Sequence, residues 1–191
     1  MIQLTIERDA TARAEALLKL IPGGIEKAAA SAANRAIDAM KTASGKETAS
    51  RYRAKAADVK KTLTLKRARA GSPVAEMVSR GRRRPLTLYR VSAGKRRSRV
   101  KAAVKKQSGL KPIPKAFMVG GRPMVRMRPD RVRPDWGAMR ALVGPAIPQI
   151  LKNEETVKAL EKIGAEKFLE RLDHEVWRIL NGIGGKGGGR R

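Results

Sequence analysis

The basic residues of this chain are concentrated in its middle third, and this limits which segments can enter a hydrophobic core. Residues 80–140 contain 20 Lys and Arg but only 2 Asp and Glu, against 44 and 17 in the whole 191-residue chain. A charged side chain is almost never fully buried without a partner, so most of this block must stay at the surface. Aromatic residues make up only 3% of the chain, which leaves Ala, Leu, Ile, Val and Met to build the core.

The two ends of the chain carry less net charge and show the apolar spacing of amphipathic helices. We expect helices over residues 9–20 and 25–40, separated by the stretch IPGG, with an alanine-rich face that another element can approach closely. A long helix is expected over residues 153–180. Asn153 is a good N-cap, Glu154 and Glu155 fall in the first turn, and Asn181-Gly182 ends the helix.

The basic middle region favours short strands and loops. Apolar residues alternate or form short runs bounded by Gly and Pro over residues 58–68, 73–80, 85–92, 98–106 and 116–128. The Gly-Gly-Arg-Pro stretch in the last of these predicts a hairpin. In GPAIPQIL, residues 144–151, Pro145 can open a short helical turn and Pro148 follows too soon for a regular helix, so we expect a stiff connector there.

These elements predict an α+β fold, with N-terminal helices and a long C-terminal helix packed on a small antiparallel sheet with basic loops. We expect one domain over residues 1–180. It would comprise N-terminal helices (1–50), a basic strand and loop region (51–140), a Pro-containing connector (141–152) and the C-terminal helix (153–180). Residues 181–191, rich in Gly and Arg, are expected to form a flexible tail.

The residue types that most enzymes need are scarce. The chain has no Cys and a single histidine, His174, which is expected to be an ordinary exposed helix residue. A two-metal nuclease needs several carboxylates near its DNA, and the basic block offers only Asp130 and Asp135. We therefore expect no catalytic, metal-binding or cofactor-binding residues, and no enzymatic activity. The absence of a membrane-length apolar run and of a signal sequence predicts a cytoplasmic protein.

A sequence pI of about 11.5 makes polyanions the expected partners. Arginine suits phosphate because its planar fork donates paired hydrogen bonds, and the Arg-rich loops lack a recognition helix, so contact with nucleic acid should be independent of sequence. Acidic protein surface is the competing partner, and a merely solvated charge surplus is the third alternative. The candidate contact residues are Arg80, Arg82, Arg83, Arg84, Lys95, Arg96, Arg97, Arg99, Lys101, Lys105 and Lys106.

Apolar residues near the C-terminal end predict packing against a sheet or a neighbouring subunit. A 28-residue amphipathic helix is about 42 Å long, more than a domain of this size needs. The uncharged connector before it adds an apolar triplet. The candidate packing residues are Pro145, Ile147, Pro148, Ile150, Leu151, Leu172, Val176 and Leu180.

Several stretches then occur together in a characteristic order. They are AANRAIDAMKT, SRYRAKAADVKKTLTLKRA, RGRRRPLTLYRV, KAFMV and GPAIPQILKNEE, followed by the long terminal helix. In this order the chain resembles the phage minor tail protein Z family, tail completion proteins of long non-contractile tails, over residues 25–180. AADVKK, RRRPL and GPAIPQIL carry most of the resemblance.

The resemblance implies a non-enzymatic virion component at the head-proximal end of the tail, assembled in the host cytoplasm. It implies partners among the tail terminator, the tail tube and the head connector, and a homo-oligomeric ring matching the tail's symmetry, such as a hexamer. It also implies contact of the basic loops with genome DNA or with an acidic tube wall. The alternative is a free-standing, sequence-nonspecific nucleic-acid-binding protein.

Overall fold

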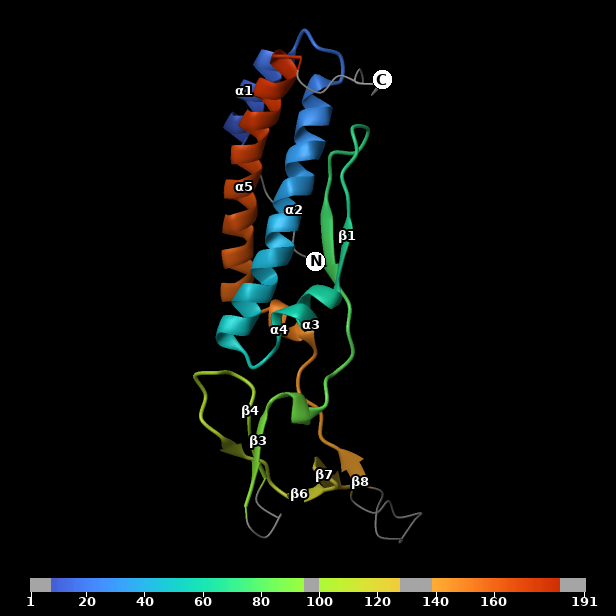
Figure 1. Ribbon diagram of the computed structural model, residues 1–191, viewed down its shortest axis with the longest axis vertical. Coiled ribbons are helices and arrows are strands. Elements are labelled where there is room, and N and C mark those ends of the chain that lie inside the picture. Colours follow the sequence, from blue (N-terminus) through green and yellow to red (C-terminus); the bar gives the residue numbers. More distant parts are fainter. Residues whose placement is uncertain (1–7, 95–99, 128–138, 183–191) are drawn as a thin grey trace, which may run out of the picture. The chain divides into compact units, whose positions relative to one another are not determined.

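The computed structural model describes residues 8–94, 100–127 and 139–182, with helices at both ends of the chain and short antiparallel strands between them (Figure 1). Contacts divide the chain into two compact units. The first, here called the helical unit, contains Met1–Ser44, Leu63–Ser79 and Asn153–Arg191. The second, here called the basic unit, contains Gly45–Thr62 and Arg80–Lys152. The expected single domain over residues 1–180 stays a prediction.

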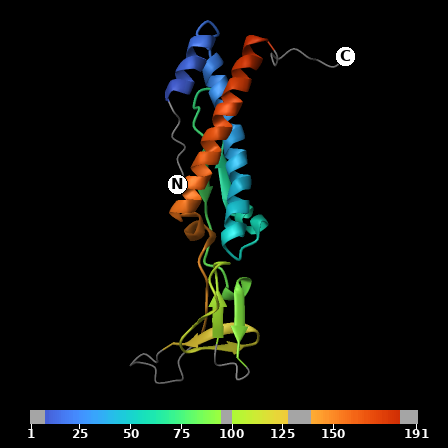
Figure 2. The same ribbon diagram turned by 90° about the vertical axis from the view of Figure 1, so that its left-hand side faces the viewer.

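The helical unit is built from three helices and one hairpin. Helices α1 (Arg8–Leu18), α2 (Gly24–Arg51) up to Ser44, and α5 (Glu154–Leu180) lie lengthwise beside one another (Figures 1 and 2). Strands β1 (Leu63–Lys66) and β2 (Glu76–Ser79) pair in register from Leu63 opposite Ser79 to Lys66 opposite Glu76.

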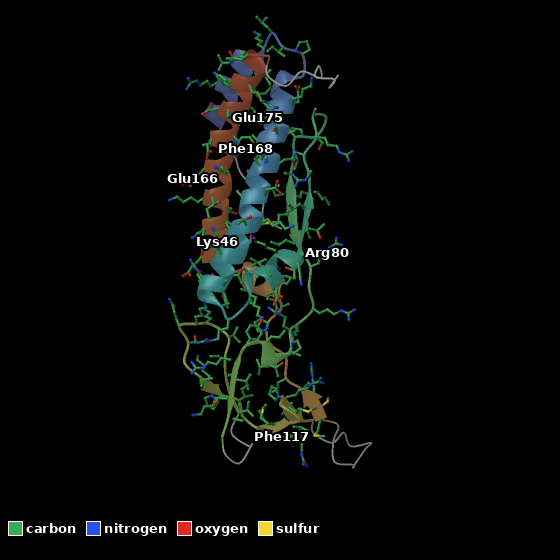
Figure 3. The ribbon with its side chains drawn as sticks, in the orientation of Figure 1. Lys46, Arg80, Phe117, Glu166, Phe168 and Glu175 are labelled. Atoms are coloured by element: carbon green, nitrogen blue, oxygen red, sulfur yellow. The ribbon has the colours of Figure 1, made fainter. Side chains whose placement is uncertain are left out.

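The core of the helical unit joins small side chains of α2 to large ones of α5. Ala28, Ala32 and Ala36 are almost completely buried, and Phe168, labelled in Figure 3, is 2% exposed in the same cluster. Because alanine side chains are small, the larger side chains of α5 can pack directly against α2. The predicted alanine-rich packing face is therefore confirmed.

The β1–β2 hairpin is fastened to α2 by two polar side chains one helical turn apart. The Asn34 amide exchanges two hydrogen bonds with the backbone of Ala68, at 3.0 Å to the carbonyl oxygen and 2.9 Å from the amide nitrogen. Asp38 accepts hydrogen bonds from both terminal nitrogens of Arg67, at 3.2 and 3.1 Å. In AANRAID the polar residues Asn34 and Asp38 thus hold the hairpin, while the alanines of the same stretch contribute to the core.

Helix α5 follows the sequence prediction closely. Its N-cap, Asn153, accepts a hydrogen bond from the Glu155 backbone N–H at 3.1 Å, and the helix ends at Leu180 before Asn181 and Gly182. Helix α2 instead runs beyond the predicted end at residue 40, as far as Arg51. Gly45, within this extension, lets the start of α3 come close, since a Cβ there would lie 3.3 Å from the Cβ and the carbonyl oxygen of Ala56.

The basic unit contains short elements only, apart from the last turns of α2. Helix α3 (Ala56–Lys61) is followed by the 3₁₀ turn η1 (Leu86–Leu88) and strands β3 (Arg90–Ala93), β4 (Val100–Ala103) and β5 (Lys111–Pro112). Strands β6 (Ala116–Val119), β7 (Arg122–Arg126) and β8 (Met139–Ala141) form a second sheet, and helix α4 (Ile147–Leu151) comes last. The strand orders are β3-β4-β5 and β6-β7-β8, all antiparallel.

One local prediction was wrong. Residues 58–61 belong to helix α3 and not to a strand, because Val59 is the one buried residue of AADVKK and Ala and Lys favour helix. Within the expected connector GPAIPQIL the short helix α4 forms, because Pro148 falls in the first turn, where no intrahelical donor is needed. The Gln149 side chain also accepts a hydrogen bond from the Ala146 N–H at 3.0 Å.

The α+β class is confirmed, with N-terminal helices and a long C-terminal helix. The antiparallel strands of the described residues form three small sheets, where one sheet was expected. The hairpin predicted at Gly-Gly-Arg-Pro is present, with positive φ of 53° and 76° at Gly120 and Gly121.

The predicted tail falls outside the described residues beyond Gly182. Within the described part of the chain, no helix has the length and apolar character needed to cross a membrane.

Candidate polyanion-binding surface

Three segments that are distant in the sequence meet in the basic unit and hold the Arg-rich loop. The Arg80 N–H donates to the Thr62 carbonyl at 2.9 Å, directly after α3. On the other side, the Gly144 N–H donates to the Arg84 carbonyl at 2.7 Å, and the Leu86 N–H donates to the Leu142 carbonyl at 3.1 Å. Residues 80–86 are therefore fixed between the end of α3 and the segment that leads to α4.

Tyr89 fits tightly over Gly144 in this arrangement. A Cβ at residue 144 would lie 2.5 Å from Cε2 of the Tyr89 ring, so only glycine fits. The Tyr89 hydroxyl donates to the Pro145 carbonyl at 2.9 Å. Burial raises the pKa of the Tyr89 phenol, and the positive charge of Arg84 acts in the opposite direction. The stretches RRRPLTLY and GPAIP thus form one packed joint.

Arg84 belongs to this joint and not to the exposed basic surface. Its Nη2 donates to Asp58 Oδ2 at 2.6 Å, and its side chain is only 14% exposed. Its guanidinium carbon lies 6.0 Å from the Tyr89 ring centre. Because this side chain is mostly buried and paired with a carboxylate, it offers a polyanion little accessible surface, and we assign Arg84 a structural role.

The neighbouring arginines of the same loop are accessible to a partner. Arg80, Arg82 and Arg83 are exposed, and Arg80 is labelled in Figure 3. The backbone bond to Thr62 places this loop beside Lys60 and Lys61 at the end of α3, and both of these lysines are exposed. Sequence reasoning missed Lys60 and Lys61, although the Lys-Lys pair that closes AADVKK was the available signal.

A second group of basic residues forms where the end of α2 pairs with the segment after β4. The Arg53 N–H donates to the Val104 carbonyl and the Lys106 N–H donates to the Arg51 carbonyl, both at 2.9 Å. The ammonium of Lys105 lies 6.0 Å from the ring centre of Tyr52. Lys105 and Lys106 are exposed, as is Lys101 on β4. The remaining candidates, Lys95, Arg96, Arg97 and Arg99, lie outside the described residues.

The charges of the two units differ sharply. The basic unit contains 27 Lys and Arg and 4 Asp and Glu, a net charge of +23, while the helical unit contains 17 and 13, a net charge of +4. Both carboxylates described in the basic unit are already paired within it, Glu47 with Arg51 at 3.6 Å and Asp58 with Arg84. Most of the positive charge of this unit must therefore find its counter-charge outside the unit.

The candidate packing residues fall into buried and exposed groups. Ile147, Ile150 and Leu151 on α4 are 2–4% exposed, so the chain's own packing already covers them. Leu172 and Val176 lie in the core of the helical unit. Pro145 and Pro148 are half-buried, and Leu180 at the end of α5 is 48% exposed. Of these eight, Leu180 offers a neighbouring subunit the most surface.

His174 is exposed on α5, and no three His, Asp or Glu side chains in the described part of the chain are grouped to hold a metal ion. The candidate site therefore consists of exposed Arg and Lys side chains around the packed joint.

The segments that form this surface fall within a match to a known protein family. Neither the curated proteins nor the solved structures contain a match to the chain. The family model described as prophage minor tail protein Z matches residues 11–180, which include the joint, the basic surface and both helical ends. The chain therefore belongs to the prophage minor tail protein Z family, a family of phage minor tail proteins.

Proposed function

We propose that this protein is a non-enzymatic tail completion protein that acts at the head-proximal end of the phage tail, with its basic unit turned toward a polyanion. The observation that carries this proposal is the uneven charge: +23 on the basic unit against +4 on the helical unit. The two described carboxylates of the basic unit can balance only a small part of that charge. An interior that DNA traverses, or an acidic tube wall, would supply the missing counter-charge.

The helical unit would serve assembly in this proposal. Its near-neutral surface is suited to packing against protein, and exposed Trp177 and Leu180 at the end of α5 offer apolar contact area. The proposed neighbours are the tail terminator, the tail tube and the head connector, and further copies of the chain in a ring such as a hexamer. A closed ring would place all copies of the basic unit in equivalent positions.

The first experiment tests the role in the virion. Deleting the gene should leave tails that do not give infectious particles, and the protein should be detected at the head-proximal end of complemented tails by immuno-electron microscopy. A soluble monomer that is absent from purified tails would refute the proposal. It would favour the alternative of a free-standing nucleic-acid-binding protein.

The second experiment tests the basic surface by salt-titrated binding to random-sequence duplex DNA. Replacing Arg82 and Arg83 by Ala should weaken binding equally for all sequences, and it should reduce the salt slope by up to about 0.9 for each phosphate that is no longer neutralised. The matched control replaces exposed Arg13 and Lys19 near α1 by Ala, which removes the same charge from the helical unit. Equal weakening in both variants would show that total charge, and not this surface, sets the affinity.

A further inference from the structure

A small cavity in the basic unit lies where η1 meets the β6-β7-β8 sheet. Its volume is about 280 Å³, just below the roughly 300–1,000 Å³ of small-molecule pockets. Its wall includes Pro85, Leu86, Pro123, Leu142 and Val143, and Arg122 is the one charged residue among the described residues that line it. A cavity of this size and lining fits an aliphatic side chain better than a cofactor.

The cavity is built on buried residues but remains open at its edge. Leu86 is 5% exposed and Pro123 is among the fully buried side chains, so its floor belongs to the packed interior. Val143 is 40% exposed, and Ala141 is exposed beside it. The Leu86 N–H bond to Leu142 and the Leu142 N–H bond to Pro123, at 2.8 Å, hold the three lining segments together. The cavity is therefore preformed.

Arg122 makes the cavity favour a negatively charged ligand. Arg122 is exposed on β7, and no carboxylate in the described residues pairs with it. The positive charge of Arg122, a lining residue, therefore creates a positive field at the cavity. An anionic group on the ligand would gain from this field, while a cationic group would be repelled.

From these observations we infer that the cavity binds a short acidic segment of a neighbouring tail protein, with one aliphatic side chain in the cavity and a carboxylate on Arg122. Duplex DNA fits this cavity less well, because its phosphates can reach Arg122 but its bases are stacked and offer no aliphatic group. The inference rests on the proposed tail role. It assigns protein to this part of the basic unit and leaves the Arg80–Arg83 loop for the polyanion.

The test is an NMR titration of the full-length labelled protein with blocked peptides. Acetyl-Asp-Leu-Asp-amide should shift the backbone amides of Thr87, Leu142 and Val143. Acetyl-Asp-Ser-Asp-amide, which lacks the aliphatic group, and acetyl-Lys-Leu-Lys-amide, which reverses the charge, should each bind roughly threefold or more weakly. Duplex DNA should shift amides of residues 80–83 and not those of the cavity.

Two variants separate the cavity from general charge. Arg122→Glu should weaken binding of the Asp-Leu-Asp peptide by roughly threefold or more. Arg140→Glu is the matched control, because it makes the same change of charge in the same sheet at a residue that does not line the cavity. If the spectrum of Arg122→Glu shows unfolding, Val143→Asp at the cavity edge replaces it.

Equal response to all three peptides, or equal weakening in the two charge variants, would overturn the inference. Cavity shifts that depend on protein concentration alone would also overturn it, because they would identify a second copy as the occupant. None of these outcomes concerns the tail role, which the deletion experiment tests on particles. A protein that binds the peptide but is absent from tails would refute the proposed function instead.

Discussion

The helical unit and the basic unit are stabilised in different ways, although they share helix α2. In the helical unit, long amphipathic helices bury Phe168, Leu172 and a stripe of alanines, and 17 basic residues are nearly balanced by 13 acidic ones. In the basic unit, short strands and turns bury single apolar residues such as Leu86, Val100 and Ile147 and are joined by backbone hydrogen bonds, and 27 basic residues face only 4 acidic ones.

This difference shows how a chain of such high charge can fold. Like charges repel, and the cost is smaller when the cations stay in water on loops and strand edges. The basic unit therefore combines buried apolar residues on short elements with ion pairs such as Arg84 with Asp58, while the helical unit buries its apolar residues between long helices. Substitutions in the two units should accordingly differ in size and in their dependence on salt.

The largest expected effect is in the core of the helical unit. Phe168→Ala should lower the free energy of unfolding by about 3–5 kcal/mol, because it leaves a cavity beside the alanines of α2. Hydrogen exchange measured peptide by peptide should accelerate over α1, α5 and the first turns of α2. Phe117→Ala, the same change at a half-buried position on β6, should cost on the order of 1 kcal/mol. Equal effects would remove the distinction between the units.

The second-largest effect is expected at the partly buried Asp58–Arg84 pair, which is compared with the exposed Asp38–Arg67 pair. Asp58→Ala should cost about 1–3 kcal/mol, because it leaves the mostly buried Arg84 guanidinium without its carboxylate. Asp38→Ala breaks the exposed pair with Arg67 in the helical unit and should cost about 0–1 kcal/mol. Urea unfolding at low and high salt measures both changes. A larger effect of Asp38→Ala would contradict the structural role given to Arg84.

Gly144→Ala probes the joint between Tyr89 and the segment before α4. The new Cβ would lie 2.5 Å from the Tyr89 ring, and relieving that clash should cost about 1–3 kcal/mol. Gly109→Ala is the control, since nothing lies within 4 Å of a Cβ there, and it should change stability by less than about 0.5 kcal/mol. Thermal unfolding of the two variants, side by side, gives the comparison.

The smallest effect concerns the Tyr89 hydroxyl. Tyr89→Phe removes its hydrogen bond to Pro145 and should cost about 0.5–1.5 kcal/mol at neutral pH. Because the pKa of Tyr89 is raised above its ordinary value of 10.0, the folded state holds this proton more tightly than the unfolded state does. That contribution is complete below pH 10 and disappears as pH rises through the folded pKa. Unfolding measured from neutral to alkaline pH should show a smaller decline for Tyr89→Phe than for the wild type.

Sequence reasoning was most successful where one local signal was enough. Helix α5 could be predicted to its ends because Asn153, the first-turn glutamates and Asn181-Gly182 all act within a few residues. The β6–β7 hairpin followed from Gly120 and Gly121, which supply the positive φ of its turn. Local reasoning failed at α3, where a six-residue segment with one buried side chain fits either a helix or a strand.

The candidate site could be predicted only in part from the sequence. The basic composition of residues 80–106 predicted a polyanion surface, and Arg80, Arg82 and Arg83 are indeed exposed. Nothing local distinguishes Arg84 from Arg83, because the difference arises from Asp58, 26 residues earlier in the chain. The Lys-Lys pair of AADVKK is visible in the sequence, but the place of Lys60 and Lys61 beside the loop follows only from the backbone bond between Arg80 and Thr62.

The sequence by itself determined the helices at the two ends, the exposure of most basic side chains in the middle block and the likeness to a tail protein family. These follow from spacing, charge and motif order, which are properties of neighbouring residues along the chain. The tertiary structure alone decided which arginine is structural, why residue 144 is glycine and where the cavity beside Arg122 lies. Those depend on side chains that are distant in sequence and become neighbours only when the chain has folded.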